Sequence, residues 1–377
     1  MKYMGSKRSM LRNGLGELIC QEAKYARRIV DLFCGAGSVA WFAAEKTSRP
    51  TLAVDLQTFS AILARAVIGR KCPLDSNKLV EKWLNKVKNI RCAAQLWKEA
   101  VMLEKSAKKL VLEARALCKE LSRIGPIWNA YGGHYFSPRQ ALTFDYMLKY
   151  LPSSEPERSV CITAIMFAAS KCAAAPGHTA QPFQPTPRAE IFILEAWKRD
   201  PLLICEKALH EICSRHAIVP GKAFVSDAID FVKNLRSEDL VFVDPPYSGV
   251  QYSRFYHVFE TIAQGQCNFV IGVGRYPPIE DRPQSHFSNK SQSKLALEKL
   301  ISSLANIGVT VIFTFPAGEC SNGLSGKIVT ETAQIWFDVE KKLIKGRFST
   351  LGGNNIDRAS RKSSEELLLL MRPKRKH

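Results

Sequence analysis

The 377-residue sequence lacks several features that would point to other classes of protein. It contains no run of roughly 18 or more apolar residues, so we expect no membrane-spanning helix and no membrane partner. Its first residues lack the apolar core of a secretion signal. The eleven cysteines include no Cys-x-x-Cys pair. We therefore expect reduced thiols in a cytoplasm, and neither a zinc site nor any other metal centre.

Acidic residues are also scarce, because 35 Asp and Glu stand against 54 Lys and Arg. The resulting net charge of +19 favours a polyanionic partner, with nucleic acid ahead of a membrane surface. A hydrophobic content of 46% is typical of a globular protein, and the length leaves room for two or three domains.

A pattern typical of α/β cofactor-binding folds occupies the first part of the chain. A strand that starts at Ile29 runs into a turn at Gly35 and Gly37, and Ser38 is placed to cap the next helix. The spacing Gly-x-Gly-x-x-Ala fits the dinucleotide fingerprint. A second strand ends in Asp55, where such folds place the carboxylate that holds ribose hydroxyls. The pattern predicts an adenosine-containing cofactor without specifying which; without the acid, the glycines would be only a tight turn.

A second motif follows the apolar strand at 240–243, which ends at Asp244-Pro245-Pro246-Tyr247. The prolines cannot extend the strand, and the carboxyl ends of strands in open α/β sheets are where ligands bind. A carboxylate and a proline carbonyl can accept both hydrogens of an adenine amine and free its nitrogen lone pair. A tyrosine face can stack on the base, which contributes roughly 1–3 kcal/mol. The alternative is a plain Asp-Pro-Pro turn after a strand.

Between these motifs, the character of the sequence changes. Residues 76–123 indicate long helices rich in lysine and arginine, which form either a nucleic-acid surface or a solvated face. An aromatic loop at 128–136 leads to a helix at Ser137-Pro138. The proline-rich loop at 176–188 is a candidate surface for bases or backbone, or a bridge between two helices.

The α/β pattern resumes with a strand that ends at Asp227. Basic residues at 275–294 indicate a loop that orders on nucleic acid. Further strands are predicted at 309–315, 331–345 and 361–371.

These residues resemble the DNA adenine-N6 methyltransferases of the Dam type, or alpha group. The order of cofactor motif, insert and Asp-Pro-Pro-Tyr is similar over nearly the whole chain. The resemblance implies an α/β fold with the Rossmann-like sheet of class I S-adenosylmethionine-dependent methyltransferases. It also implies a discontinuous catalytic domain, 1–69 and 222–377, and a mainly helical target-recognition insertion, 70–221.

The resemblance implies a role for each motif residue. The catalytic residues would be Asp244, Pro245, Pro246 and Tyr247. The residues that bind S-adenosylmethionine would be Tyr3, Lys7, Asp31, Phe33, Cys34, Gly35, Gly37, Asp55, Asp227 and Asp244. The substrate would be double-stranded DNA with its target adenine flipped out of the helix. A cognate restriction nuclease is a candidate partner, and the setting would be prokaryotic or phage-like.

Other readings of the same residues remain open. RNA adenine or cytosine N4 could be the methylated position, although Asp before Pro-Pro-Tyr resembles the adenine-specific enzymes. A nicotinamide-dependent oxidoreductase could use the same glycine turn, but it leaves Asp244–Tyr247 and the basic insert unexplained. A nucleic-acid-binding module without activity would not need the chemical residues that are present here.

Overall fold

The computed structural model of the chain describes residues 7–107, 109–121, 123–347 and 363–374. These residues form two compact units. The helical unit comprises 73–215 and 253–282, and the sheet unit comprises the described residues of 5–72, 216–252 and 283–377. The segment 253–282 belongs to the helical unit.

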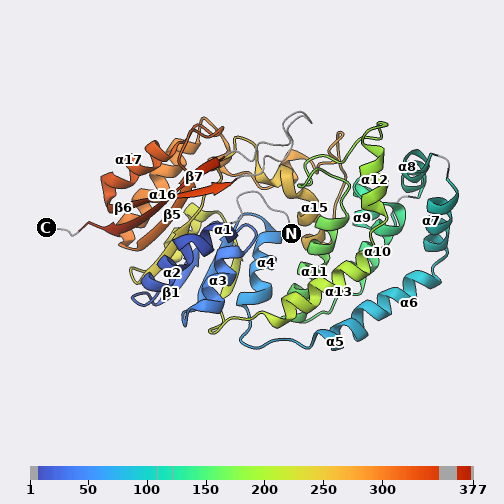
Figure 1. Cartoon of the computed structure of the whole chain (residues 1–377), viewed down its shortest axis with the longest axis horizontal. Coiled ribbons are helices and arrows are strands. Elements are labelled where there is room, and N and C mark those ends of the chain that lie inside the picture. The colour runs from blue at the N-terminus through green and yellow to red at the C-terminus, as the bar shows by residue number, and fades with distance from the viewer. Residues whose placement is uncertain (1–6, 108, 122, 348–362, 375–377) are drawn as a thin grey trace. The chain divides into compact units, whose positions relative to one another are not determined.

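The sheet unit is built on one seven-stranded sheet with the order β3-β2-β1-β4-β5-β7-β6 (Figure 1). The strands are β1 (Arg28–Asp31), β2 (Thr51–Asp55), β3 (Lys222–Val225), β4 (Asp239–Val243), β5 (Thr310–Pro316), β6 (Phe337–Arg347) and β7 (Ser363–Pro373). The first five strands of that order are parallel, and β7 pairs antiparallel with both β5 and β6. The expected α/β class is confirmed. The strand order reverses between β1 and β4, and a reversal of this kind opens a crevice at the carboxyl ends of the two strands.

Helices cover both faces of this sheet because alternate residues of its central strands point to opposite sides. On one side, Ile29, Leu240 and Ile312 pack with α2 (Gly16–Glu22) and α3 (Ser38–Lys46). On the other, Val30, Val241 and Val311 pack with α16 (Ser293–Ile307) and α17 (Gly326–Trp336). The remaining helices of this unit are α1 (Arg8–Met10), the π-helix η1 (Leu11–Leu15), α4 (Thr58–Ile68), α14 (Ala228–Phe231), and the short 3-10 helices η3 (Val232–Asn234) and η5 (His286–Ser288).

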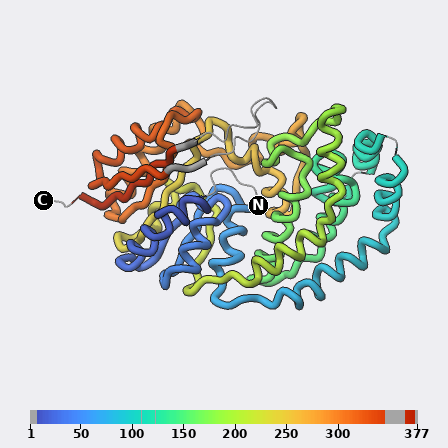
Figure 2. The backbone as a smooth tube through the Cα atoms, viewed as in Figure 1, coloured from blue at the N-terminus to red at the C-terminus, as the bar shows by residue number. Residues whose placement is uncertain are grey.

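The helical unit contains α5 (Ser76–Leu79), the π-helix η2 (Val80–Leu84), α6 (Asn85–Ala93), α7 (Gln95–Ser106), α8 (Leu110–Glu120), α9 (Pro126–Tyr131), α10 (Pro138–Lys149), α11 (Glu157–Cys172), α12 (Glu190–Trp197), α13 (Pro201–Ser214), most of α15 (Tyr252–Gln264) and the 3-10 helix η4 (Ile279–Asp281). Figure 2 shows the run from α5 through η2 to α6 as one extended arc of backbone. No helix in the described ranges is long and apolar enough to span a membrane.

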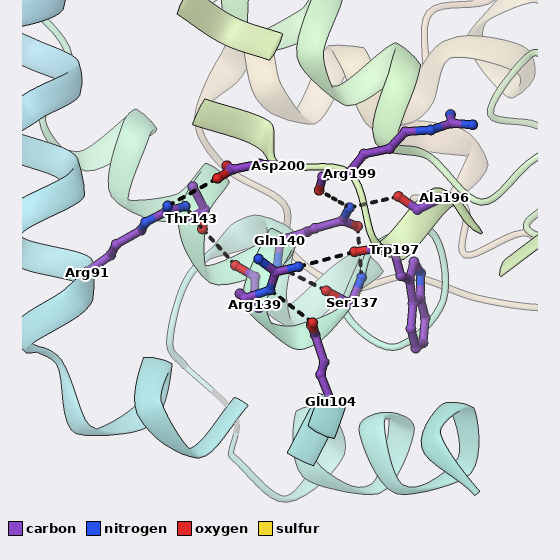
Figure 3. Close-up of polar contacts among 10 residues, drawn as sticks. All are labelled: Arg91, Glu104, Ser137, Arg139, Gln140, Thr143, Ala196, Trp197, Arg199 and Asp200. Carbon is purple, nitrogen blue, oxygen red and sulfur yellow. Dashed lines mark hydrogen bonds and ion pairs between the residues drawn. The ribbon is translucent and has the colours of Figure 1, made fainter. Parts of the chain in front are cut away.

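Helix α10 makes polar contacts with several neighbouring segments of the helical unit (Figure 3). It begins with a capping box, in which Ser137 accepts from the Gln140 backbone and the Gln140 side chain accepts from the Ser137 N–H. The same Gln140 side chain donates to the carbonyls of Ala196 and Arg199, at 2.9 and 2.8 Å. The adjacent residue Arg139 pairs with Glu104 on α7. These contacts connect α10 to α7 and to the link between α12 and α13.

Three local expectations are wrong. Gly37, not Ser38, is the N-cap residue of α3, and the cap has no side-chain hydrogen bond. Residues 331–336 continue α17, because Val329, Thr332 and Ala333 recur at helical spacing on its buried face, and the strand begins only at Phe337. The first residues of the predicted aromatic loop form α9, where the Trp128 and Tyr131 rings are buried in the core.

Candidate active site

Asp31 and Asp244 lie at the same edge of the sheet. Asp31 is the last residue of β1 and Asp244 follows the last residue of β4, and the register aligns Asp31 with Phe242. Both β1 and β4 run parallel, so their carboxyl ends meet at the point where the strand order reverses. The structure therefore brings the glycine-turn strand and the Asp-Pro-Pro-Tyr strand together.

The Asp244 carboxylate is held through one of its two oxygens. The Lys7 ammonium lies 3.0 Å from Oδ1, and the Thr314 hydroxyl donates to the same oxygen at 2.9 Å. Burial raises the pKa of Asp244, while Lys7 and Thr314 act in the opposite direction. Since both contacts of this carboxylate among the described residues use Oδ1, Oδ2 is available to accept a hydrogen bond from a substrate.

Lys7 is itself shared between two acids. Its Nζ lies 3.3 Å from Glu366 Oε2 on β7, and the side chain is only 3% exposed. Burial alone would lower the pKa of Lys7, but the charges of Asp244 and Glu366 outweigh it and raise that pKa above its usual range. Lys7 is therefore a cation whose charge is balanced locally.

Two residues of this arrangement were missed from the sequence, although each leaves a signal. Thr314 carries a hydroxyl in the buried, mainly apolar part of β5, and Glu366 precedes the leucine run of β7. Polar residues in buried strands need partners, so their positions alone were informative.

The Pro-Pro-Tyr segment is fixed by a further residue that sequence reasoning missed. Asn322, which is fully buried, donates to the carbonyls of Pro246 and Phe287 at 3.0 and 2.9 Å. Tyr247 is half-buried, with its ring edge-on to Tyr252 at 6.5 Å between centroids. In the sequence, Asn322 is one turn residue among several, and nothing distinguishes it.

The glycine turn is closed by the predicted ribose acid. The N–H groups of Gly35 and Gln57 donate to the two oxygens of Asp55, at 2.8 and 2.9 Å. Gly35 and Gly37 have φ of 45° and 73°, a left-handed conformation that glycine adopts without strain. A Cβ at Gly37 would also lie 3.1 Å from the Trp41 indole nitrogen.

The acids at this edge are close enough to affect one another. Burial raises the pKa of Asp31 well above its usual range, the Phe33 N–H opposes this, and the charges of Asp244 and Asp55 add to it. Asp31, Asp55 and Asp244 therefore lie close together at this edge of the sheet.

The other residues predicted to bind the cofactor have varied settings. Asp227 is the N-cap of α14 and accepts from the Ile229 N–H at 2.8 Å. Cys34 is buried in the turn, and Phe33 is half-buried with its ring edge-on to Phe287. Tyr3 lies outside the described residues.

Searched over the described ranges, the chain has no group of three or more His, Cys, Asp or Glu side chains arranged to hold a metal ion. No curated protein matches the chain.

Residues 3–100 and 206–271 match the family model of the D12 class N6 adenine-specific DNA methyltransferases. The protein is an adenine-N6 DNA methyltransferase. The matched segments contain the glycine turn, Asp55 and Asp244–Tyr247, so they include both ligand-facing motifs of the methyltransferase. The match implies S-adenosylmethionine as methyl donor and DNA as substrate, and it does not favour RNA, cytosine N4 or nicotinamide chemistry.

Proposed function

We propose that this methyltransferase is a Dam-type, alpha-group enzyme that methylates a flipped adenine within a specific DNA sequence. In this proposal a class I methyltransferase sheet carries catalysis, and the insertion at 70–221 reads the target. The observation that carries it is the position of Asp244 and Tyr247 at the carboxyl end of β4, with Asp244 Oδ2 left available.

The residues around the glycine turn are suited to S-adenosylmethionine. When bound, this cofactor supplies a methyl group activated by a sulfonium centre. The neighbouring carboxyl groups of Asp31, Asp55 and Asp244 suit its positive charge. The residues that would hold it are Tyr3, Lys7, Asp31, Phe33, Cys34, Gly35, Gly37, Asp55, Asp227 and Asp244.

The adenine would be oriented by the Asp-Pro-Pro-Tyr segment. Asp244 Oδ2 and the carbonyl of Pro245 would each accept one hydrogen of the N6 amine, and the Tyr247 ring would stack on the base. The Pro246 carbonyl already accepts from Asn322, which fixes the segment while leaving the Pro245 carbonyl to the substrate. A base in duplex DNA cannot reach these groups, so the adenine must be flipped out. The chain's contribution is chiefly orientation, without a covalent intermediate.

Lys7 and Glu366 extend this proposal. We propose that Lys7, besides contacting the cofactor, keeps Asp244 ionised and fixes the orientation of its carboxylate. Glu366 also pairs with the Lys7 ammonium, so Lys7 does not fully neutralise Asp244. Asp244 therefore remains a good hydrogen-bond acceptor for the adenine amine. Both are positioning residues in this scheme.

Replacement of the central carboxylate tests the proposed function. We expect Asp244→Ala to abolish transfer of tritiated methyl groups to DNA, because the amine loses its acceptor, and to retain DNA affinity. Asp230→Ala, an exposed acid on α14, is the control and should transfer at the wild-type rate. Substantial residual turnover by Asp244→Ala would contradict the role assigned here.

The wider setting also remains a proposal. We place the enzyme in a cytoplasm, in a prokaryotic or phage-like system, with a cognate restriction nuclease as candidate partner. Sequencing of methylated bases in DNA from cells that express the enzyme would reveal the target sequence. A single short motif methylated at every occurrence would support the restriction-modification setting.

A further inference from the structure

The helical unit carries an exposed apolar segment that its own core does not use. Between α15 and η4, the side chains of Phe269, Ile271 and Val273 are 60%, 50% and 59% exposed. Phe269 and Ile271 precede a turn at 272–275 and Val273 lies within it, and Ile271 pairs antiparallel with Tyr276 across this turn. We call Phe269, Ile271 and Val273 the apolar tip.

The turn at 272–275 is held by contacts with the rest of the helical unit. The fully buried Tyr135 hydroxyl lies 2.9 Å from the Gly274 carbonyl and 2.6 Å from the Thr179 carbonyl, which share its one proton. The Arg275 guanidinium donates to the carbonyls of Ala130 and Asn129 at the end of α9, at 2.7 and 3.0 Å. The tip is therefore presented on a preorganised support, which lowers the entropy cost of binding through it.

Two arginine side chains contact Tyr276, which pairs with Ile271 of the apolar tip. Arg254 donates to the Tyr276 hydroxyl at 3.1 Å with its guanidinium 4.9 Å from the ring centre, and the Arg282 guanidinium lies 5.5 Å from that centre. Burial lowers the pKa of Arg282, and the charge of Arg254 lowers it further. The acids Glu280 and Asp281 are on the same segment, and Asp281 is within reach of the Asn268 amide.

We propose that the apolar tip inserts against base steps of the substrate DNA duplex while Arg254 and Arg282 bind the phosphates beside it. The inference rests on DNA as the substrate of this enzyme. Apolar side chains flanked by arginine are the combination that unstacks base pairs in DNA-bending proteins, and unstacking assists an enzyme that extrudes a base. The flanking cations and the net charge of +19 favour duplex DNA over a second copy of this basic chain.

The test compares variants of the full chain by fluorescence anisotropy with unmethylated plasmid fragments, in the presence of S-adenosylhomocysteine. We expect Phe269→Ser/Val273→Ser to weaken duplex binding by about tenfold or more, with little change in the salt dependence. We expect Arg254→Gln/Arg282→Gln to reduce the slope of log affinity against log salt by about 1–2, since each lost phosphate contact removes about 0.9.

Controls make these outcomes specific. Ile335→Ser, an apolar side chain 65% exposed on α17, should bind as wild type, and Phe269→Leu should retain most of the affinity. Wild-type affinity in the serine double variant would overturn the proposal, as would a loss of self-association without a loss of DNA binding. Failure of the proposed function is distinguishable, because it would appear as turnover in Asp244→Ala whatever the tip variants do.

Discussion

At the scale of single residues, the site depends on how one buried charge is balanced. Asp244 is held by a cation and a hydroxyl that meet on the same oxygen, and the cation is shared with Glu366. This balance decides the protonation state of Asp244, because burial alone would favour the neutral acid. A neutral Asp244 could not accept a hydrogen bond from an amine with the same strength.

Loss of the Thr314 hydroxyl therefore has a predictable effect on pH dependence. In Thr314→Val, the pKa of Asp244 loses one of the interactions that lower it and rises further. The reaction needs the carboxylate, so the acid limb of the kcat/KM profile should move to higher pH, with less change on the basic side. Thr310→Val, on the same strand but away from Asp244, should leave the limb where it is. An unmoved limb in Thr314→Val would assign it to another group.

At the scale of elements, the glycine turn and the start of α10 are each fixed by one side chain that bonds to several backbone groups. In the glycine turn, the Asp55 carboxylate accepts from two backbone N–H groups. At α10, the fully buried Gln140 side chain bonds to backbone groups on three segments. Both arrangements restrict the backbone segments that they join.

We predict that Gln140→Ala destabilises the helical unit. The change removes the side-chain donor from the Ala196 carbonyl and from the part-buried Arg199 carbonyl, and it removes half of the capping box. Unsatisfied buried groups cost about 1–3 kcal/mol each, so urea unfolding should show a loss of roughly 2–4 kcal/mol. Gln95→Ala, which breaks an exposed bond to Glu99, should change stability by no more than about 0.5 kcal/mol. Equal effects in both variants would mean that the network in Figure 3 is not cooperative.

At the scale of the whole molecule, an excess of positive charge accompanies a chain that acts on a polyanion. With a net charge of +19, phosphate contacts should dominate the affinity for DNA and make it strongly dependent on salt. The lysines of the insertion, such as Lys98 and Lys105 on α7, are exposed and available for this purpose.

Charge reversal tests whether the insertion supplies those contacts. We predict that Lys98→Glu/Lys105→Glu weakens DNA binding about tenfold near physiological salt and lowers the salt slope by about 2. Lys299→Glu/Lys327→Glu, on exposed positions of α16 and α17, makes the same change in net charge elsewhere. If both double variants lose affinity equally, the effect is one of overall charge and recognition does not lie on α7.

The sequence by itself determined the elements that local patterns encode. Strands β1, β2, β4 and β5, the left-handed glycine turn and the prolines that stop β4 all follow from periodicity and from the limited backbone freedom of Gly and Pro. The switch from helix to strand at Phe337 was misjudged, because short apolar patterns fit both periods.

Only the tertiary structure decided what these elements hold between them. Lys7, Asp244 and Glu366 come from three distant segments, and they meet because β4, β5 and β7 are neighbours in the sheet. The same holds for Asn322 on the Pro246 carbonyl and for the association of 253–282 with the helical unit. Such contacts depend on strand order and on burial, which no local pattern of residues encodes.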